Sequence, residues 1–270
     1  MMNMEYRILN NGVQMPAAGF GTWDLRGQEC ISCAAKAITL GYRLIDTAIM
    51  YGNEAECAQG VRQSGIDRSE VFITTKINSP YGTYQKTAKA VDDSLKRMKL
   101  DYIDLILIHE PYERYIEMYK ALEDAYKAGK VRAIGVSNLN RRLYERLVQS
   151  CEIVPAVNQV ECHVYYPQLS YSRYLKEKGT VMESWAPFTE GRRRIFDEPV
   201  LKNIGAAHGK TSGQIALKYL LQNGITVIPK TSKEERMKEN IDLFDFELSE
   251  DELKQIALLD KGQSLFGWYD

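Results

Sequence analysis

Four side chains able to hold or transfer a proton occur at or just after apolar segments of the sequence. Asp46, Lys76 and His109 each lie near the end of such a segment, and Tyr51 follows Asp46 by five residues. A buried carboxylate is costly unless a cation pairs with it, so we expect Asp46 to pair with Lys76. A lysine beside a tyrosine hydroxyl favours the phenolate and lowers the tyrosine pKa from about 10. The set predicts that Tyr51 donates a proton to a carbonyl oxygen, which His109 orients.

Two other kinds of site find little support in the sequence. The three histidines, His109, His163 and His208, share no metal-ligand spacing, so we expect no metal site. No nucleophilic serine accompanies the proton-transfer residues, so another molecule must deliver the electrons for a reduction.

Cys30 and Cys33 form a C-x-x-C pair, which is a redox motif when it lies at a strand-to-helix turn. Here the surrounding QECISCAAKAITLG is typical of a helix. We therefore favour two thiols that pack from one helix, with a redox pair as the alternative.

Composition narrows the class of protein. A chain of 270 residues fits two ordinary domains or one barrel-sized domain, and its 44% hydrophobic and 26% charged residues suit a soluble protein. A net charge of −1 and the lack of a membrane-length apolar segment indicate neither nucleic-acid nor membrane binding. The N-terminus lacks a signal-peptide pattern and the five cysteines lack a disulfide framework, so we expect a cytoplasmic protein with reduced thiols. The sequence contains no signal of the oligomeric state, and a monomer is compatible with it.

Short apolar segments alternate with segments of helical spacing along the chain. The predicted strands cover 17–23, 43–48, 71–77, 103–109, 131–138, 156–163, 180–187 and 226–232. The predicted helices cover 29–40, 54–64, 84–98, 116–128, 141–149, 172–178, 212–223 and 249–259. Eight such units predict an α/β fold of the (β/α)8 TIM-barrel type, as one domain over residues 1–270. A doubly wound sheet is the alternative, but GFGTWD has only two glycines of the dinucleotide fingerprint.

Polar residues mark the carboxyl-terminal part of most predicted strands. They are Asp46, Lys76, His109, Ser137, Asn138, Gln159 and Lys230. Any one of them, taken singly, is more often structural than functional. Chance would scatter them along the strands, whereas the carboxyl ends of barrel strands form the active-site face. Their shared position therefore predicts a site.

These positions fall within motifs that resemble the aldo-keto reductase family. The motifs are GFGTW (19–23), DTAxxYGNE (46–54), TTK (74–76), LILIH (105–109), GKVRAIGVSN (129–138), NQVECH (158–163), IPKTSKEERMKEN (228–240) and DFELSEDEL (245–253). The resemblance implies a catalytic tetrad of Asp46, Tyr51, Lys76 and His109, with Tyr51 as the general acid. It implies a substrate pocket that includes Trp23, Tyr51, His109 and Glu110.

The resemblance also implies NADPH as the cofactor, bound in an extended pose over the barrel mouth. Positions that match the nicotinamide contacts are Ser137, Asn138, Gln159 and Trp185. Positions that match the adenosine and 2′-phosphate contacts are Lys230, Thr231, Arg236, Glu239 and Asn240. Further cofactor positions carried over are Gly21, Thr22 and Asp46. Lysine and arginine near a strand end and a helix start suit a phosphate dianion, although such a segment alone is also typical of a solvated helix.

The loop after Trp185 departs from the family pattern. Pro187–Phe196 replaces the usual Leu-Gly-x-Gly, and Glu190 stands where the pyrophosphate should pass. Its three arginines, at 192–194, either compensate for Glu190 or form solvated surface.

Glu110 departs too, because many members of the family have tryptophan at this position. The side chain either faces the pocket or turns outward to solvent or Arg114. The tail beyond the last helix carries Phe266, Trp268 and Tyr269, aromatic residues that could close over a substrate.

Together these features predict an enzyme that reduces aldehydes or ketones with NADPH, with small-molecule carbonyls as its partners. One alternative is a nicotinamide-binding barrel that serves as a regulatory or interaction subunit with little turnover. Another is a phosphate-binding isomerase without nicotinamide, which would leave Trp185 and its neighbours unexplained.

Overall fold

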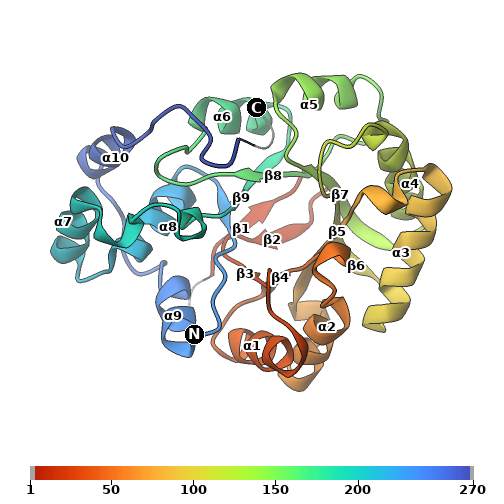
Figure 1. Ribbon diagram of the computed structural model, residues 1–270, viewed down its shortest axis with the longest axis horizontal. Helices are drawn as coiled ribbons and strands as arrows, with labels where there is room; N and C mark the ends of the chain where they lie inside the picture. The colour runs from red at the N-terminus through yellow and green to blue at the C-terminus, as the bar shows by residue number, and fades with distance from the viewer. Residues whose placement is uncertain (1–3, 268–270) are drawn as a thin grey trace.

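Eight parallel strands curl into one sheet at the centre of the computed structural model, which describes residues 4–267 (Figure 1). The strands are β3 (Phe20–Gly21), β4 (Leu44–Asp46), β5 (Phe72–Ile77), β6 (Ile103–Ile108), β7 (Val131–Ser137), β8 (Val157–Glu161), β9 (Val181–Trp185) and β10 (Thr226–Val227). Each pairs with the next, and bridges from Ala18 to Val227 and from Gly21 to Lys230 join the two edges. The predicted (β/α)8 barrel is confirmed. The prediction of one domain over residues 1–270 extends beyond the described residues and stays a prediction.

Helices surround the sheet (Figure 1). They are α1 (Gly27–Thr39), α2 (Glu54–Gln63), α3 (Tyr84–Met98), α4 (Tyr115–Lys127), α5 (Arg141–Val148), α6 (Leu169–Glu177), α7 (Pro199–His208), α8 (Ser212–Gln222), α9 (Glu234–Ile241) and α10 (Glu250–Ala257). The eight predicted helices are all present, and two described helices were not among them: α7, between β9 and α8, and α9, after β10. The first and last barrel strands are shorter than predicted, in part because Pro229 has no N–H for the ladder.

Alternation along the strands divides the barrel interior into an apolar and a polar layer. Side chains two residues apart point to the same face of a strand. Leu44 and Asp46 are successive inward residues of β4, and Phe72 lies four residues before Lys76 on β5. The apolar layer therefore lies toward the amino ends of the strands, and the polar layer lies toward their carboxyl ends.

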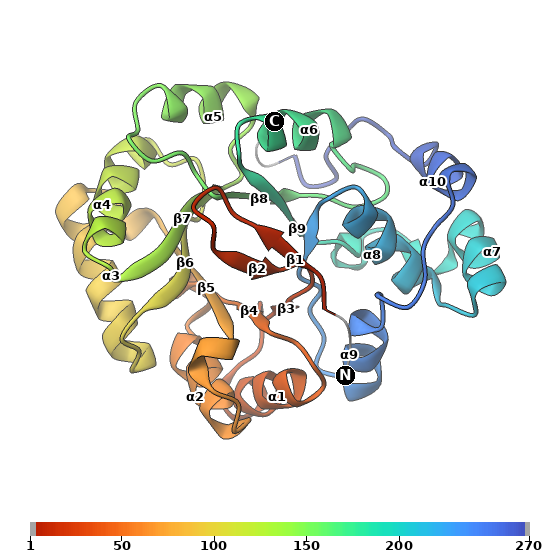
Figure 2. The same cartoon turned by 180° about the vertical axis from the view of Figure 1, so that it is seen from behind.

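A two-stranded hairpin that the sequence did not predict closes the amino-terminal end of the barrel (Figure 2). Its strands are β1 (Tyr6–Ile8) and β2 (Gln14–Pro16), paired antiparallel. Leu9 and Met15 are buried against the apolar interior layer. Asn11 anchors the turn through its Nδ2, which donates to the carbonyl of Arg132 over 2.8 Å. The open end of the barrel is therefore the end that carries the polar layer.

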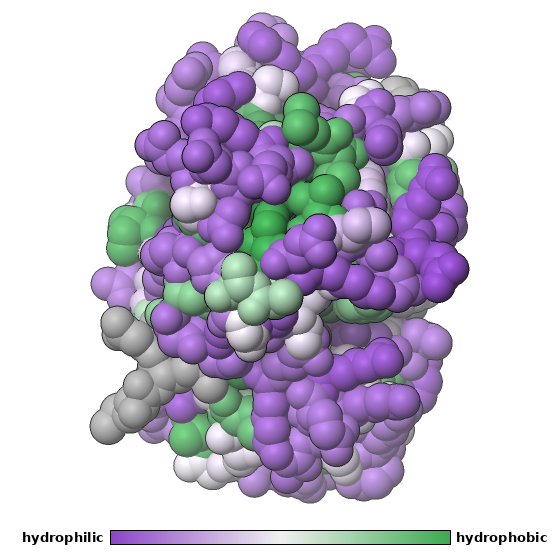
Figure 3. Space-filling view, turned by 90° about the vertical axis from the view of Figure 1, so that its left-hand side faces the viewer, coloured by the Kyte–Doolittle hydropathy of each residue, from purple (hydrophilic) through white to green (hydrophobic). Residues whose placement is uncertain are grey.

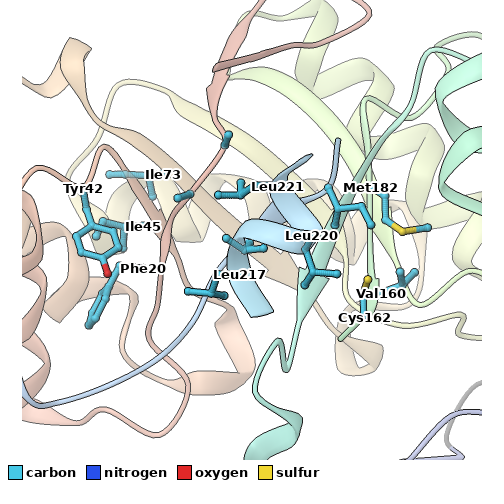
Figure 4. Close-up of a cluster of buried hydrophobic side chains, with 14 of the residues drawn as sticks. Phe20, Tyr42, Ile45, Ile73, Val160, Cys162, Met182, Leu217, Leu220 and Leu221 are labelled. Carbon is cyan, nitrogen blue, oxygen red and sulfur yellow. The ribbon is translucent and has the colours of Figure 1, made fainter. Parts of the chain in front are cut away.

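A second core fills the space between the strands and the helices. In Figure 4, Phe20 and Tyr42 lie beside Ile45 and Ile73, while α8 contributes Leu217 and its neighbours. The Tyr42 hydroxyl, although buried, donates to the carbonyl of Met237 over 2.9 Å. This outer core fixes the helices to the barrel and leaves the strand ends free to carry the site.

The molecular face that carries α7 and α10 is mostly hydrophilic, and the largest of its apolar areas lies near the centre (Figure 3). Among the helices of residues 4–267, none has both the length and the apolar character that a membrane span requires.

Candidate active site

Lys76 connects Asp46 and Tyr51 at the carboxyl end of the barrel. Its Nζ lies 2.5 Å from Oδ1 of Asp46, 3.1 Å from the carbonyl oxygen of Thr47 and 3.3 Å from the Tyr51 hydroxyl. Lys76 and Asp46 are both buried, and they come from adjacent strands. Tyr51 lies in a short 3₁₀ turn, Ile49–Tyr51, that directly follows β4. The three side chains that the sequence singled out are thus in contact.

The pKa values of this cluster differ in one respect from the prediction. Burial disfavours the charge on Lys76, but Asp46, Tyr51 and Glu183 together outweigh it and raise the Lys76 pKa. Burial is also the largest influence on Tyr51, and it raises the tyrosine pKa above 10 although Lys76 lowers it. The prediction of a lowered Tyr51 pKa is therefore wrong for this structure. Tyr51 keeps its proton at neutral pH.

His109 lies beside Tyr51, with ring centroids 5.7 Å apart. Burial and the nearby Lys76 charge lower the His109 pKa to about 3, so the ring is neutral at pH 7. Its Nδ1 is buried, and no partner for it exists within residues 4–267. The carbonyl oxygen of His109 accepts from Nδ2 of Asn138 over 3.2 Å. A neutral His109 can donate a hydrogen bond to a substrate oxygen, but it is a poor source of a proton.

A cleft of about 750 Å³ opens above these residues. Trp23 forms one wall and packs edge-on against Tyr51, with centroids 4.9 Å apart. Glu110 and Glu190 both line the cleft, and Glu110 also interacts with the Tyr112 hydroxyl. Arg114 pairs with Glu117 over 3.4 Å, so it is not the partner of Glu110, and the pocket-facing orientation of the Glu110 carboxylate stays a prediction. The lining of the cleft therefore includes two acidic residues, Glu110 and Glu190.

The four residues matched to the nicotinamide also line this cleft, and they bond to one another. Ser137 Oγ donates to the carbonyl of Gln159 over 2.8 Å, and Trp185 Nε1 donates to Oδ1 of Asn138 over 2.7 Å. Gln159 Nε2 donates to Oδ2 of Asp46 over 3.0 Å, which ties this group to the Lys76 cluster. Gly21 and Thr22 complete the cleft wall, and Oγ1 of Thr22 donates to the Asp46 carbonyl over 2.8 Å.

A second cleft, of about 500 Å³, continues from the first, because Phe188 and Lys230 line both. It contains the residues matched to the adenosine end, namely Lys230, Thr231, Arg236, Glu239 and Asn240. Neither Lys230 nor Arg236 forms an ion pair within residues 4–267. Two cations without acidic partners in one cleft suit an anionic group.

The loop Pro187–Phe196 takes part in the cleft through Glu190, whose φ of 48° is left-handed. Arg194 pairs with Asp197 over 2.9 Å, and the Arg192 guanidinium lies 4.1 Å from the centroid of the Phe266 ring. Among the described residues, the walls of both clefts contain none of the three arginines. All three are exposed, as solvated surface requires, but the charge of Arg192 also opposes the effect of burial on the Glu190 pKa, so Arg192 compensates in part for Glu190.

The C-terminal tail reaches the cleft wall. Phe266 packs edge-on against Trp185, with ring centroids 4.9 Å apart. Glu161, at the end of β8, accepts from Ser264 Oγ over 2.5 Å and from the backbone N–H of Leu265 over 2.8 Å. The tail therefore buttresses Trp185, while the other two aromatic residues predicted to close the pocket, Trp268 and Tyr269, lie outside the described residues.

Sequence reasoning missed Glu161 and Glu183, two buried carboxyls on neighbouring strands. Glu183 Oε2 accepts from Gln159 Nε2 over 2.6 Å. Both are charged residues within apolar strand segments, VNQVE and VMESW, and this anomaly was the available signal.

The five cysteines are all free thiols. Cys30 Sγ lies 3.6 Å from Cys57 Sγ on α2, so the nearest sulfur contact of the C-x-x-C pair is to a different helix. Both residues of that pair lie within α1 and are buried, which agrees with helix packing. Within residues 4–267, no three His, Cys, Asp or Glu side chains are grouped as metal ligands, and the prediction of no metal stays a prediction.

Comparison with known proteins agrees with this geometry. A model of the Aldo/keto reductase family matches residues 17–261. Morphine 6-dehydrogenase of Pseudomonas putida is 42% identical over 269 residues, which cover 94% of this chain and 90% of that protein. Glyoxal reductase of Bacillus subtilis (strain 168) is 42% identical over 257 residues, covering 94% and 92%. A solved aldo-keto reductase complexed with NADPH superposes with a TM-score of 0.91 at 33% identity, covering 98% of this chain and 90% of that one. The chain therefore belongs to the aldo-keto reductase family.

Proposed function

We propose that this protein reduces aldehydes or ketones to alcohols with NADPH, and that Tyr51 supplies the proton. The observation that carries the proposal is the contact of the Tyr51 hydroxyl with Lys76 Nζ, 3.3 Å away, at the base of the larger cleft. A protonated tyrosine beside a buried ammonium can release its proton when a substrate oxygen gains electron density. The ammonium then stabilises the phenolate that forms.

Each member of the proposed tetrad has a distinct task. Asp46 holds Lys76 in its charged form and fixes the direction of the ammonium. His109, neutral at pH 7, donates a hydrogen bond to the carbonyl oxygen and aligns it with the Tyr51 hydroxyl. NADPH, when bound, supplies the hydride.

The two connected clefts fit NADPH by shape and by charge. Gln159 and Asn138 present amide groups at the inner end, where a nicotinamide carboxamide can bond, and Trp185 offers an aromatic face. Lys230 and Arg236, unpaired among the described residues, would hold the 2′-phosphate at the outer end. Glu190 also lines the larger cleft, on the side of the loop where the pyrophosphate of a bound cofactor is expected.

We further propose small neutral carbonyls as substrates, because Glu110 and Glu190 make the pocket wall acidic. The name of the Bacillus subtilis relative, glyoxal reductase, refers to a small neutral dicarbonyl and supports this choice. The five free thiols support a cytoplasmic setting.

Two measurements test the proposal. Titration of NADPH against tryptophan fluorescence should show saturable quenching, because Trp185 and Trp23 line the cleft. NADPH oxidation should then be followed across a panel of aldehydes, ketones and dicarbonyls. Binding without turnover on any of them would favour a regulatory subunit, and lack of binding would reject a nicotinamide function.

A further inference from the structure

Glu183 is a buried carboxyl that the proposed reaction does not use. It lies on β9, fully buried, and its register partners are Gln159 on β8 and Thr226 on β10. Its Oε2 accepts from Gln159 Nε2 over 2.6 Å. Its Oε1 is buried and has no hydrogen-bond partner in the part of the chain that the structure describes.

The groups around Glu183 leave it without a cation. The ammonium of Lys76 has three N–H donors, and Asp46, Thr47 and Tyr51 accept from it. The buried carboxyls of Glu183 and Asp46 thus lie near one ammonium, and its three donors are bonded to Asp46, Thr47 and Tyr51 rather than to Glu183. An uncompensated buried carboxylate is costly, whereas a protonated carboxyl carries no charge. Burial and the Asp46 charge raise the Glu183 pKa to about 8, against the opposing effects of Gln159 and Lys76.

Glu183 also decides how the Gln159 amide is presented. One Nε2 hydrogen of Gln159 is directed to Asp46 Oδ2 and the other to Glu183 Oε2, over 3.0 and 2.6 Å. Both donors of the amide are therefore used inside the barrel. Its oxygen is left as the acceptor for a ligand in the cleft that Gln159 lines.

We propose that Glu183 is a positioning residue of the reduction, which holds the Gln159 amide for the nicotinamide and carries a proton whose loss slows donation by Tyr51. This inference rests on the proposed function. When the proton leaves to solvent at alkaline pH, the interior gains a negative charge close to Asp46 and Lys76. A second negative charge near Tyr51 disfavours the phenolate that must form there, so reduction slows. Gln159 and Thr226, the neighbours on the flanking strands, are neutral and cannot compensate.

The first test is the pH dependence of kcat/KM for NADPH-dependent reduction, from about pH 6 to about pH 10. The native protein should lose activity with an apparent pKa near 8. In Glu183→Gln, which is permanently neutral, this loss should move upward by about one pH unit or more. The matched control is Glu177→Gln, at the exposed end of α6, which should keep the native profile. Coincident profiles for Glu183→Gln and the native protein would overturn the proposal.

The second test reads the proton without any turnover. The infrared difference spectrum of native protein minus Glu183→Gln at pH 7 should contain the C=O stretch of a protonated carboxylic acid, and alkaline pH should remove it. Lack of this band would refute a protonated Glu183 even if the enzyme is active. Conversely, a native protein that shows the band but reduces no carbonyl would refute the proposed function and leave the protonation intact.

The third test concerns Gln159. Glu183→Met removes the acceptor at similar volume, and NADPH should bind about fivefold more weakly or worse, the loss of one hydrogen bond. Binding of 2′,5′-ADP, which reaches only the adenosine end, should stay as in the native protein and report an intact fold. Equal NADPH affinity would show that Glu183 does not position the amide. If Glu183→Met fails to fold, the isosteric glutamine variant decides the proposal alone.

Discussion

Trp185 donates its indole N–H to Oδ1 of Asn138 across 2.7 Å, and the Asn138 amide in turn donates to the His109 carbonyl. Asn138 has a φ of 62°, a left-handed conformation that asparagine tolerates better than most residues. The wall of the cleft and the strand end that bears His109 are therefore linked through one side chain.

Removal of this link should destabilise the protein. Asn138→Ala leaves the Trp185 N–H without its acceptor and places alanine at a positive φ, so the free energy of unfolding should fall by about 1–3 kcal/mol. Trp185→Phe should lower the free energy of unfolding less in the Asn138→Ala background than in the native protein, because the hydrogen bond is already lost there. Urea denaturation of the four proteins measures this coupling, and strictly additive losses would show that the bond contributes nothing.

Tyr51→Phe keeps the ring but loses the proposed acid. Carbonyl reduction should fall by about 10²-fold or more, the usual contribution of a positioned general acid. NADPH affinity, measured by tryptophan fluorescence, should barely change. Tyr6→Phe, in the hairpin at the opposite end of the barrel, serves as the control. Near-native turnover of Tyr51→Phe would remove Tyr51 from the mechanism.

Cofactor choice should depend on the unpaired cations of the second cleft. Charge-assisted hydrogen bonds from Lys230 and Arg236 to the 2′-phosphate are worth about 1.5–3 kcal/mol each, so NADPH should bind at least about tenfold more tightly than NADH. Arg236→Ala should reduce the difference between the NADPH and NADH affinities. Lys238 lies on the same helix and pairs with Glu234, so Lys238→Ala should leave the difference between the two affinities unchanged. Equal affinities for the two cofactors in the native protein would contradict the assignment.

Glu110 should discriminate against anionic substrates. The measurement compares kcat/KM for a neutral and a carboxylated carbonyl of similar size, at low and at high salt. Glu110→Gln should improve the carboxylated substrate severalfold relative to the neutral one, most at low salt, because it removes a like-charge repulsion. Glu113→Gln, an exposed neighbour, is the control. A ratio that does not respond to Glu110→Gln would end the argument for neutral substrates.

The attachment of the C-terminal tail should weaken in acid. Burial would raise the Glu161 pKa, but hydrogen bonds from His163, Ser264 and Leu265 together lower it below 4.5. A lowered folded-state pKa stabilises the protein above the unfolded pKa, and this contribution disappears as pH falls through the folded pKa. The difference in unfolding free energy between native protein and Glu161→Gln should therefore be constant above about pH 5 and shrink below it. If the difference in unfolding free energy grew as the pH fell, the Glu161 pKa would be raised in the folded protein rather than lowered.

The strand order and the contacts of the proposed tetrad were accessible from the sequence because they depend on local rules. Period-two alternation set Asp46 and Lys76 on the inner face, and parallel pairing of β4 with β5 brought them together. The Tyr51 pKa was not accessible, since it depends on how much of the hydroxyl is desolvated by residues distant in sequence. The hairpin was not accessible either, because its three-residue strands are too short to show a period.

The hairpin β1–β2 makes the barrel accessible from one end. The proposed substrate, cofactor and product would therefore all pass through the same opening. Gln159 and Trp185, the proposed nicotinamide contacts, line the same cleft as Trp23, a proposed substrate contact. With the proposed cofactor below the proposed substrate, we expect ordered binding, in which the cofactor enters first and leaves last.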